Sequence, residues 1–216
     1  MQEIYAGHNI YSMPCQISAP EGSGWFRYEI TSLGELKGLK MRFFGLGAKV
    51  MEKLGVSTQL IAPGDIFPAL ELGTIDAAEL SFPALDLALG FYEVAKHYYF
   101  PGWHQPITFG ELMINLDDWN SISSTQQAIL QSVCKESITR TLAESEAIQF
   151  KALQELEDKG VTLHRWNPEI LAAFEAAWQE VVAEEAENDS DFSRVWDSLR
   201  TFRENYKVWG DLGYID

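Results

Sequence analysis

An arginine near the end of a predicted strand is the first residue of this sequence that invites a chemical interpretation. Residues 38–44 alternate in character behind a glycine, so the side chain of Arg42 points to the face opposite Met41 and Phe43. At the carboxyl end of a strand, a guanidinium is able to grip a carboxylate with two hydrogen bonds, and it cannot lose its charge. An internal salt bridge is the other role open to Arg42.

A glutamate in apolar surroundings is the second candidate. Glu79 follows Ala77 and Ala78 and precedes Leu80 at the end of another predicted strand. A carboxylate in such surroundings needs a cation or a hydrogen-bond donor. Three partners stay open for it, namely Arg42, a metal ion and a ligand, because hard cations such as calcium take carboxylate and carbonyl oxygens.

The segment 98–105 is the densest aromatic patch of the sequence. Its aromatic side chains either seal an interface between two lobes or, together with His104 and Gln105, line a pocket. The four histidines of the sequence show no spacing typical of a zinc enzyme.

Motifs for nucleotide binding or catalysis do not occur in the sequence. Gly45-Leu46-Gly47 lacks the third glycine of a dinucleotide fingerprint, and neither a phosphate-binding loop nor a GxSxG motif is present. Cys15 and Cys134 stand far apart and outside any CxxC pattern, so we expect them to be unpaired small residues. Catalysis therefore has no positive support.

Composition and charge exclude several classes of protein. Of the 216 residues, 46% are hydrophobic, which is enough for one large core or two small lobes. The net charge of -16 argues against nucleic acid or an anionic membrane surface as a partner, because both need a basic face. The first five residues lack the regions of a secretory signal, which predicts either a protein that stays inside the cell or a true N-terminus further upstream.

The spacing of apolar residues, with glycine and proline as punctuation, predicts the elements that position these side chains. A loop-rich linker is expected over residues 1–23. Strands are expected at 38–44, 59–62, 77–82, 109–115 and 161–166, and helices at 48–54, 66–72, 85–99, 124–159, 168–183 and 193–209. The alternation in the first half predicts an α/β fold with a parallel sheet, and the acidic run 184–191 is expected to be a solvated helix end.

Six motifs carry a resemblance to a known family. They are residues 24–30, 36–42, 45–47, 65–70, 73–79 and 98–104, and weaker similarity continues to Trp209. In their order and approximate spacing they resemble the solute-binding proteins of tripartite ATP-independent periplasmic (TRAP) transporters, in the branch that binds 2-oxo acids and dicarboxylates. The resemblance covers nearly the whole chain.

This resemblance implies a periplasmic-binding-protein-like lobe with a parallel sheet, long C-terminal helices and an incomplete second lobe. Residues 1–23 are then an entry linker, 24–105 the α/β ligand-binding lobe, and 106–216 a mainly helical segment that completes the partner lobe. Family members carry an export signal and most of a first lobe ahead of the position where this sequence begins. The apolar surface of a half-built lobe predicts a homo-oligomer.

The resemblance also implies roles for individual residues. Arg42 corresponds to the carboxylate-binding arginine of the family, and Glu79 to the acidic residue that lines the ligand or cation site. The other predicted ligand-binding residues are Leu80, Trp103 and Gln105. Glu21 stands where many members have a glutamine, so Glu21 and Glu79 are the predicted metal ligands, and a divalent cation is favoured over sodium.

A small organic acid that is handed to TRAP membrane permease subunits is the partner implied. Its class is a 2-oxo acid, a 2-hydroxy acid or a dicarboxylate, and Leu80, where many members have a tryptophan, leaves the identity open. We expect no required cofactor, although calcium or sodium can accompany the ligand. The family is periplasmic, whereas a genuine start at Met1 implies the cytoplasm.

Two other functions stay open. One is an interaction or dimerisation module derived from such a protein that no longer serves transport. The other is an enzyme, for example a lyase with Glu79 as the base and Arg42 as the anchor, but no recognisable catalytic constellation supports it.

Overall fold

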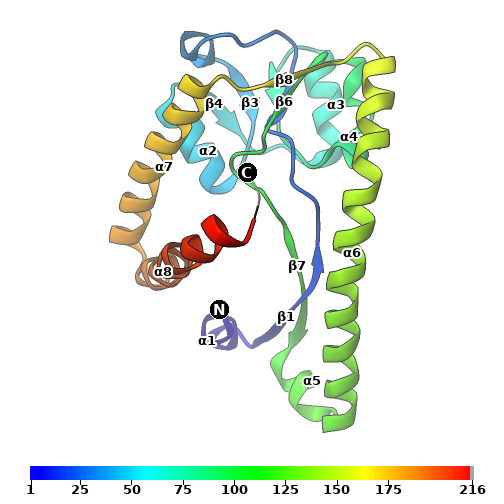
Figure 1. Cartoon of the computed structure of the whole chain (residues 1–216), viewed down its shortest axis with the longest axis vertical. Coiled ribbons are helices and arrows are strands. Elements are labelled where there is room, and N and C mark those ends of the chain that lie inside the picture. Colours follow the sequence, from blue (N-terminus) through cyan, green and yellow to red (C-terminus); the bar gives the residue numbers. More distant parts are fainter. Residues whose placement is uncertain (215–216) are drawn as a thin grey trace.

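Six short strands form a mixed sheet, in the upper part of Figure 1, in the computed structural model, which describes residues 1–214. In order across the sheet they are β4 (Ser57–Gln59), β3 (Lys40–Arg42), β5 (Ala77–Ala78), β2 (Gly24–Phe26), β6 (His97–Phe100) and β8 (Thr162–Arg165). β3 is parallel to β4 and β5, and β6 is parallel to β8, whereas β2 is antiparallel to both of its neighbours. The predicted α/β fold with parallel strands is confirmed, and β2 makes the sheet mixed.

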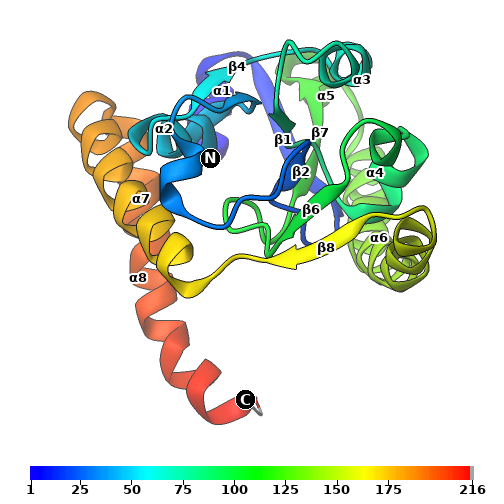
Figure 2. The same cartoon turned by 90° about the horizontal axis from the view of Figure 1, so that it is seen from above.

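Helices cover both faces of this sheet (Figure 2). α2 (Gly45–Lys53) and α7 (Pro168–Asn188) cover one face, while α3 (Pro63–Glu71), α4 (Pro83–Ala88) and the C-terminal end of α6 (Ser124–Asp158) cover the other. Successive side chains of a strand point to opposite faces. Phe26 and Tyr99 therefore join the core on the α7 side, and Trp25 and Tyr98 join the core on the α3 side.

A long arm extends from the sheet and consists of a two-stranded ribbon packed against α6 (Figure 1). β1 (Ile10–Ile17) pairs antiparallel with β7 (Phe109–Asn115), and α5 (Leu116–Ser121) precedes α6. Met13, Trp119 and Cys134 are the buried residues at the centre of the arm. The arm thus has a small core of its own, separate from the two cores of the sheet.

A disulfide joins Cys15 of β1 to Cys134 of α6, with the two Cα atoms 4.2 Å apart. The prediction that these cysteines are unpaired is therefore wrong. The packing of the ribbon on α6 brings together residues that are 119 positions apart, and cysteine spacing alone does not reveal such a contact.

The segment before β2 is more regular than the sequence predicts. In place of a loop-rich linker, α1 (Gln2–Gly7) and β1 occupy most of residues 1–23. Pro14 does not disrupt β1, because it lies at a register shift between Pro14 and Gln16, where a strand tolerates a missing N–H. The loop prediction is therefore wrong for most of this segment.

The predicted helix 85–99 is wrong beyond Ala88. α4 ends there, Gly90 takes a left-handed conformation with φ of 78°, and a short 3-10 turn (Phe91–Glu93) leads toward β6. Glycine ends a helix in this way at little steric cost, and the aromatic residues of β6 favour a strand.

The second half of the chain is mainly helical, as predicted. The side chain of Asn167 caps α7 by accepting a hydrogen bond from the backbone N–H of Ile170 at 2.8 Å. The acidic run 184–191 ends α7 and begins α8 (Ser190–Gly213), and Glu184 forms an ion pair with Lys53 of α2 at 2.7 Å. Within residues 1–214, no helix is both long enough and apolar enough to cross a membrane.

Candidate functional site

Four polar side chains from distant parts of the sequence meet at one edge of the sheet. Arg42 ends β3 and Glu79 follows β5, so the parallel pairing of these strands brings the two residues side by side. Glu21 precedes β2, and His104 lies in the turn after β6. We call these four residues the polar cluster. It lies where the carboxyl ends of parallel strands meet, which is the usual place for a ligand in an open α/β sheet.

Arg42 and Glu79 form a buried ion pair. Nη1 of Arg42 lies 3.0 Å from Oε2 of Glu79 and also donates to the carbonyl oxygen of Glu79. Nε of Arg42 donates to the carbonyl oxygen of Ile61 at 3.4 Å. The two partners are only 4% and 2% exposed. The internal salt bridge that the sequence leaves open for Arg42 is therefore present.

Glu21 is held by the segment that follows β6. Oε1 of Glu21 accepts hydrogen bonds from Nε2 of Gln105 at 2.9 Å and from Oγ1 of Thr108 at 3.0 Å. The backbone N–H of Glu21 donates to the carbonyl oxygen of Gln105 at 3.3 Å. Gln105 thus fixes the orientation of Glu21, and the second carboxylate oxygen, Oε2, remains directed at His104.

His104 lies between the two carboxylates. Its Nε2 atom is 3.4 Å from Oε1 of Glu79 and 3.8 Å from Oε2 of Glu21, distances that suit ion pairs better than hydrogen bonds. Burial alone would lower the pKa of His104, but the two carboxylates outweigh burial, and the pKa is raised. Within the described residues neither ring nitrogen has a hydrogen-bond partner, so the ring is free to face a bound molecule or ion.

The polar cluster has the composition of a cation site. Glu21, Glu79 and His104 each place a ligand atom within 4.8 Å of the other two. Two carboxylates and one guanidinium leave a net negative charge when His104 is neutral, and carboxylate oxygens suit hard cations. Burial lowers the pKa of Arg42, while the carboxylates of Glu79 and Glu21 raise it, and a guanidinium stays charged throughout.

Asp86 of α4 is a buried polar residue near the cluster that sequence reasoning missed. Its Oδ2 atom accepts hydrogen bonds from Nε1 of Trp25 at 2.8 Å and from the hydroxyl of Tyr98 at 2.9 Å. Burial raises the pKa of Asp86 to about 7, against the opposing effect of these two donors. The sequence does contain a signal for Asp86, because it is the one charged residue in the apolar run 83–89.

Gly102 allows the turn after β6 to pack directly on Glu21. A Cβ atom at this position would overlap the carbonyl oxygen of Glu21, so no larger residue fits without a shift of the backbone. This close approach brings His104 and Gln105 to the carboxylate of Glu21. The glycine in the Pro-Gly-Trp-His sequence of segment 98–105 therefore serves this close packing.

Two of the predicted site residues lie beside the polar cluster instead of within it. Leu80 is half-buried and packs against the core on the α3 side. Trp103 stacks on Phe174 of α7 with ring centroids 4.7 Å apart. Among the described residues, the hydrogen-bonded and ion-paired group therefore unites Arg42, Glu79, Glu21 and Gln105, together with His104.

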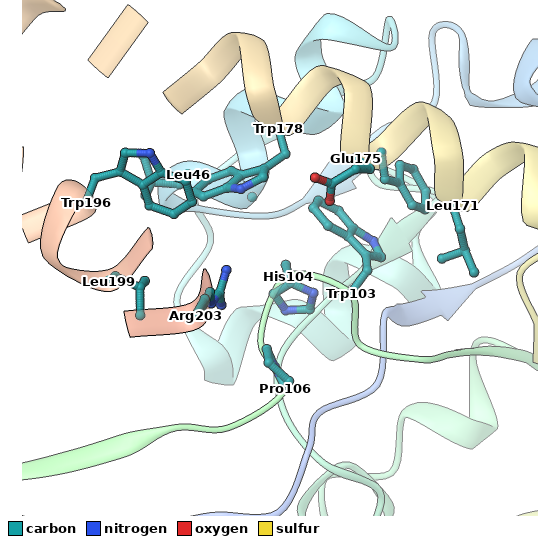
Figure 3. Close-up of a pocket in the computed structure, with 12 residues that line it drawn as sticks. Leu46, Trp103, His104, Pro106, Leu171, Glu175, Trp178, Trp196, Leu199 and Arg203 are labelled. Carbon is teal, nitrogen blue, oxygen red and sulfur yellow. The ribbon is translucent and has the colours of Figure 1, made fainter. Parts of the chain in front are cut away.

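An aromatic pocket of about 260 Å³ adjoins the cluster between α7, α8 and the turn after β6 (Figure 3). Its wall consists of Leu46, Gly47, Trp103, His104, Pro106, Leu171, Phe174, Glu175, Trp178, Trp196, Leu199 and Arg203. His104 belongs to both the pocket and the polar cluster, whereas Arg42 and Glu79 do not line the pocket in the described part of the chain. The pocket is therefore a neighbour of the ion pair and does not enclose it.

The comparison with protein families finds one match over most of the chain. The model of the bacterial extracellular solute-binding proteins, family 7, matches residues 22–189. This range includes every element of the sheet and all of the polar cluster except Glu21, which directly precedes it.

One similar protein with a described role matches the whole length of this chain. The monocarboxylate 2-oxoacid-binding periplasmic protein of Nostoc sp. (strain PCC 7120) is 35% identical over 215 residues, which are 100% of this chain and 59% of the relative. The chain thus spans somewhat more than half the length of that relative.

Solved structures agree with this similarity. A TRAP transporter solute-binding protein from Bordetella bronchiseptica RB50, a mixed-occupancy dimer with copurified calcium and picolinate, is 37% identical with a TM-score of 0.93, over 98% of this chain and 63% of that one. A TRAP periplasmic solute-binding protein from Pseudoalteromonas atlantica T6c with bound sodium and pyruvate is 32% identical with a TM-score of 0.89, over 100% of this chain and 68% of that one.

Proposed function

Because the chain belongs to the bacterial extracellular solute-binding proteins of family 7, we propose that it captures a small organic carboxylate, with a bound cation, for uptake by a TRAP membrane permease. The observation that carries this proposal is the buried Arg42–Glu79 pair with Glu21 and His104 around it. Binding and release, without turnover, is the activity proposed. The chain spans 59% of its Nostoc relative, so the role of the whole transporter is part of the proposal.

Arg42 is the proposed anchor for the carboxylate of the ligand. Its hydrogen bonds within residues 1–214 use Nη1 and Nε, which leaves the Nη2 group as the donor for an incoming acid. Phe44 lies over the guanidinium, with Cζ of Arg42 5.0 Å from the ring centroid, and shields it from water. A charged group in such a setting recognises an anion strongly, because the local dielectric constant is low.

A divalent cation is the proposed companion of the acid. With His104 neutral, Glu21 and Glu79 carry two negative charges and a bound monocarboxylate adds a third, against the single positive charge of Arg42. The excess of two is balanced by calcium and only half balanced by sodium. Calcium takes six to eight oxygen ligands, which Glu21, Glu79, the acid and water are able to supply. Calcium is reported in the Bordetella relative and sodium in the Pseudoalteromonas relative.

Isothermal titration of the full chain with pyruvate tests this function, first with calcium and then with a chelator in sodium buffer. Binding is expected in calcium and is expected to weaken strongly in Arg42→Lys, which keeps the charge but loses the planar fork of donors. Arg140→Lys on the exposed face of α6 is the matched control. A folded protein that binds no 2-oxo acid, 2-hydroxy acid or C4-dicarboxylate would contradict the proposal and favour an interaction module.

The disulfide between Cys15 and Cys134 supports a periplasmic location for the chain. Structural disulfides form and persist in oxidising compartments and are rare in the cytosol. Alkylation of the protein as isolated from its native cells, before and after reduction, tests this proposal. Two thiols that react without prior reduction would place the protein in a reducing compartment.

A second copy of the chain is the proposed partner of α8. The apolar residues Phe202, Tyr206 and Trp209 are exposed at helical spacing along one side of α8, and the Bordetella relative is described as a dimer. Light scattering coupled to gel filtration is expected to show a dimer, and a monomer for the double substitution Phe202→Ser and Trp209→Ser. Phe150→Ser, at an exposed position of α6, is the control that should leave the dimer intact.

A further inference from the structure

Two histidines meet on neighbouring parallel strands at the end of β6 opposite to the polar cluster. His97 is the first residue of β6, and His164 lies in β8, the edge strand of the sheet. His97 is paired in register with Thr162 and Tyr99 with His164, so the two imidazoles lie on one face, one step apart along the ladder. Nδ1 of His97 and Nε2 of His164 are 2.9 Å apart.

The contacts of His164 favour one tautomer. Oε1 of Glu29 lies 3.9 Å from Nδ1 of His164, so a proton on Nδ1 faces the carboxylate. Nε2 of His164 then carries a lone pair that points at His97. A carboxylate behind the far nitrogen of a histidine is the arrangement that orients histidine ligands and raises their basicity in metal sites.

The ring of His164 is also held in place by its neighbours. It stacks on the ring of Tyr99 with centroids 4.5 Å apart and planes inclined by 10°, and Tyr99 in turn stacks on Trp166. The hydroxyl of Tyr99 donates to the carbonyl oxygen of Ile30 at 3.2 Å, which fixes that ring.

We propose that His97 and His164 bind a divalent transition-metal ion, of the class of zinc, copper and nickel, with Glu29 as the residue that orients His164. The ion replaces the proton that the two facing nitrogens share, and water fills its remaining positions. Metal–nitrogen bonds of about 2.0–2.1 Å in a tetrahedral site place two nitrogens about 3.4 Å apart, so the rings need to separate by only about half an ångström. Imidazole nitrogen is a preferred ligand for this class of ion, unlike calcium.

The position of the pair distinguishes it from the polar cluster. His97 begins β6, whereas His104 lies beyond the other end of that strand, with Glu21 and Glu79. The two sites also differ in ligand chemistry, because the cluster presents mainly carboxylate oxygens and the pair presents two imidazole nitrogens. Calcium in excess therefore occupies the cluster and leaves the histidine pair to a softer ion.

Calorimetric titration of the full chain with zinc chloride, in buffer with excess calcium, tests the proposal. One zinc site is expected, and His97→Gln or His164→Gln is expected to weaken it at least about tenfold. Glu29→Gln is expected to weaken it by about tenfold, in the range seen when such orienting groups are removed. His8→Gln, at an exposed histidine of the same chain, is the matched control and should change nothing.

The electron paramagnetic resonance spectrum of one equivalent of copper(II) provides a second measurement. Coupling to two nitrogens is expected and should be lost in His164→Gln. Zinc affinity that is the same in wild type and in the His97 and His164 variants would overturn the proposal. A loss of zinc affinity in His104→Gln alone would also overturn it, because that result would place the metal in the polar cluster. If a histidine variant does not fold, the zinc affinity of Glu29→Gln tests the proposal instead, because the Glu29 side chain is exposed and its substitution should leave the fold intact.

Discussion

Nη1 of Arg42 bonds both the carboxylate and the backbone carbonyl of Glu79, so one donor group fixes the side chain and the main chain of its partner at once. The pair lies between the carboxyl ends of β3 and β5 and is almost closed to solvent. Whatever binds at Arg42 therefore acts on Glu79 as well, and the stability of the lobe and the recognition of an acid depend on the same two residues.

Removal of one partner of this pair should destabilise the fold strongly. Arg42→Met leaves the Glu79 carboxylate buried without its cation, and a loss of about 3–5 kcal/mol in the free energy of unfolding is expected. The double variant Arg42→Met and Glu79→Gln should recover part of this loss, because no buried charge is left alone. Urea denaturation of the wild type, both single variants and the double variant measures the coupling. If the loss of unfolding free energy in the double variant equals the sum of the losses in the two single variants, the pair is not coupled.

Asp86 should make stability depend on pH. Its pKa is about 7 in the folded chain and 3.8 as a free side chain, so the folded state favours the protonated form. The contribution of Asp86 is complete below about pH 4 and is lost as the pH rises through 7, by up to roughly 4 kcal/mol. Asp86→Asn keeps an oxygen that accepts from Trp25 and Tyr98, and it should flatten the curve of unfolding free energy between about pH 4 and pH 7. An unchanged curve in this variant would assign the dependence to another group.

Glu21 should determine which cation the site prefers. In Glu21→Gln the amide oxygen remains but one negative charge is gone, and calcium affinity is expected to fall at least about tenfold, since ligand charge tunes calcium binding. The ratio of calcium affinity to sodium affinity should therefore fall. Calcium titration by calorimetry in the presence of pyruvate measures this, with Glu136→Gln on the exposed surface of α6 as the control. Undiminished calcium affinity would remove Glu21 from the cation site.

Gly102→Ala should disturb the site without replacing any of its polar side chains. The added methyl overlaps the carbonyl oxygen of Glu21, so the turn that carries His104 and Gln105 must move. A loss of roughly 1–3 kcal/mol in stability and weaker acid binding are expected. Gly64→Ala is the matched control, because a Cβ there meets no atom within 4 Å and α3 gains a better helix former.

The disulfide should contribute to the stability of the arm. Reduction, or the double substitution Cys15→Ser and Cys134→Ser, is expected to lower the free energy of unfolding by about 2–5 kcal/mol. Thermal melts with and without a reductant measure this. A reductant that lowers the melting temperature of the double variant as much as that of the wild type would show that it acts elsewhere.

Strand alternation and the order of elements were enough to name Arg42 as one of three possible partners of Glu79. Both lie at the carboxyl ends of strands in an α/β order, and adjacent parallel strands end at the same edge. β3, β4, β5, β7, β8 and α6 also follow from local apolar periodicity, whereas the strand β6 lies where that periodicity predicted the end of a helix. These features depend on neighbours in sequence or on a general rule of topology.

The remaining parts of the site depend on tertiary contacts that local patterns do not encode. Asp86 meets Trp25 only because α4 packs under β2, and Cys15 meets Cys134 only because the ribbon lies on α6. Gly90 ends α4 through its backbone conformation, although the apolar spacing continues through it and favours one longer helix. Contacts across many residues decide each of these cases.

The bond between Cys15 and Cys134 turns the stretch of chain from 15 to 134 into a closed covalent ring, and five of the six strands of the sheet lie inside it. A single cut by a protease anywhere within that ring leaves both pieces attached to each other. In denaturing gel electrophoresis the nicked protein would migrate as one species until a reductant is added. β8, α7 and α8 lie outside the ring, so a cut there releases them at once when the fold is lost.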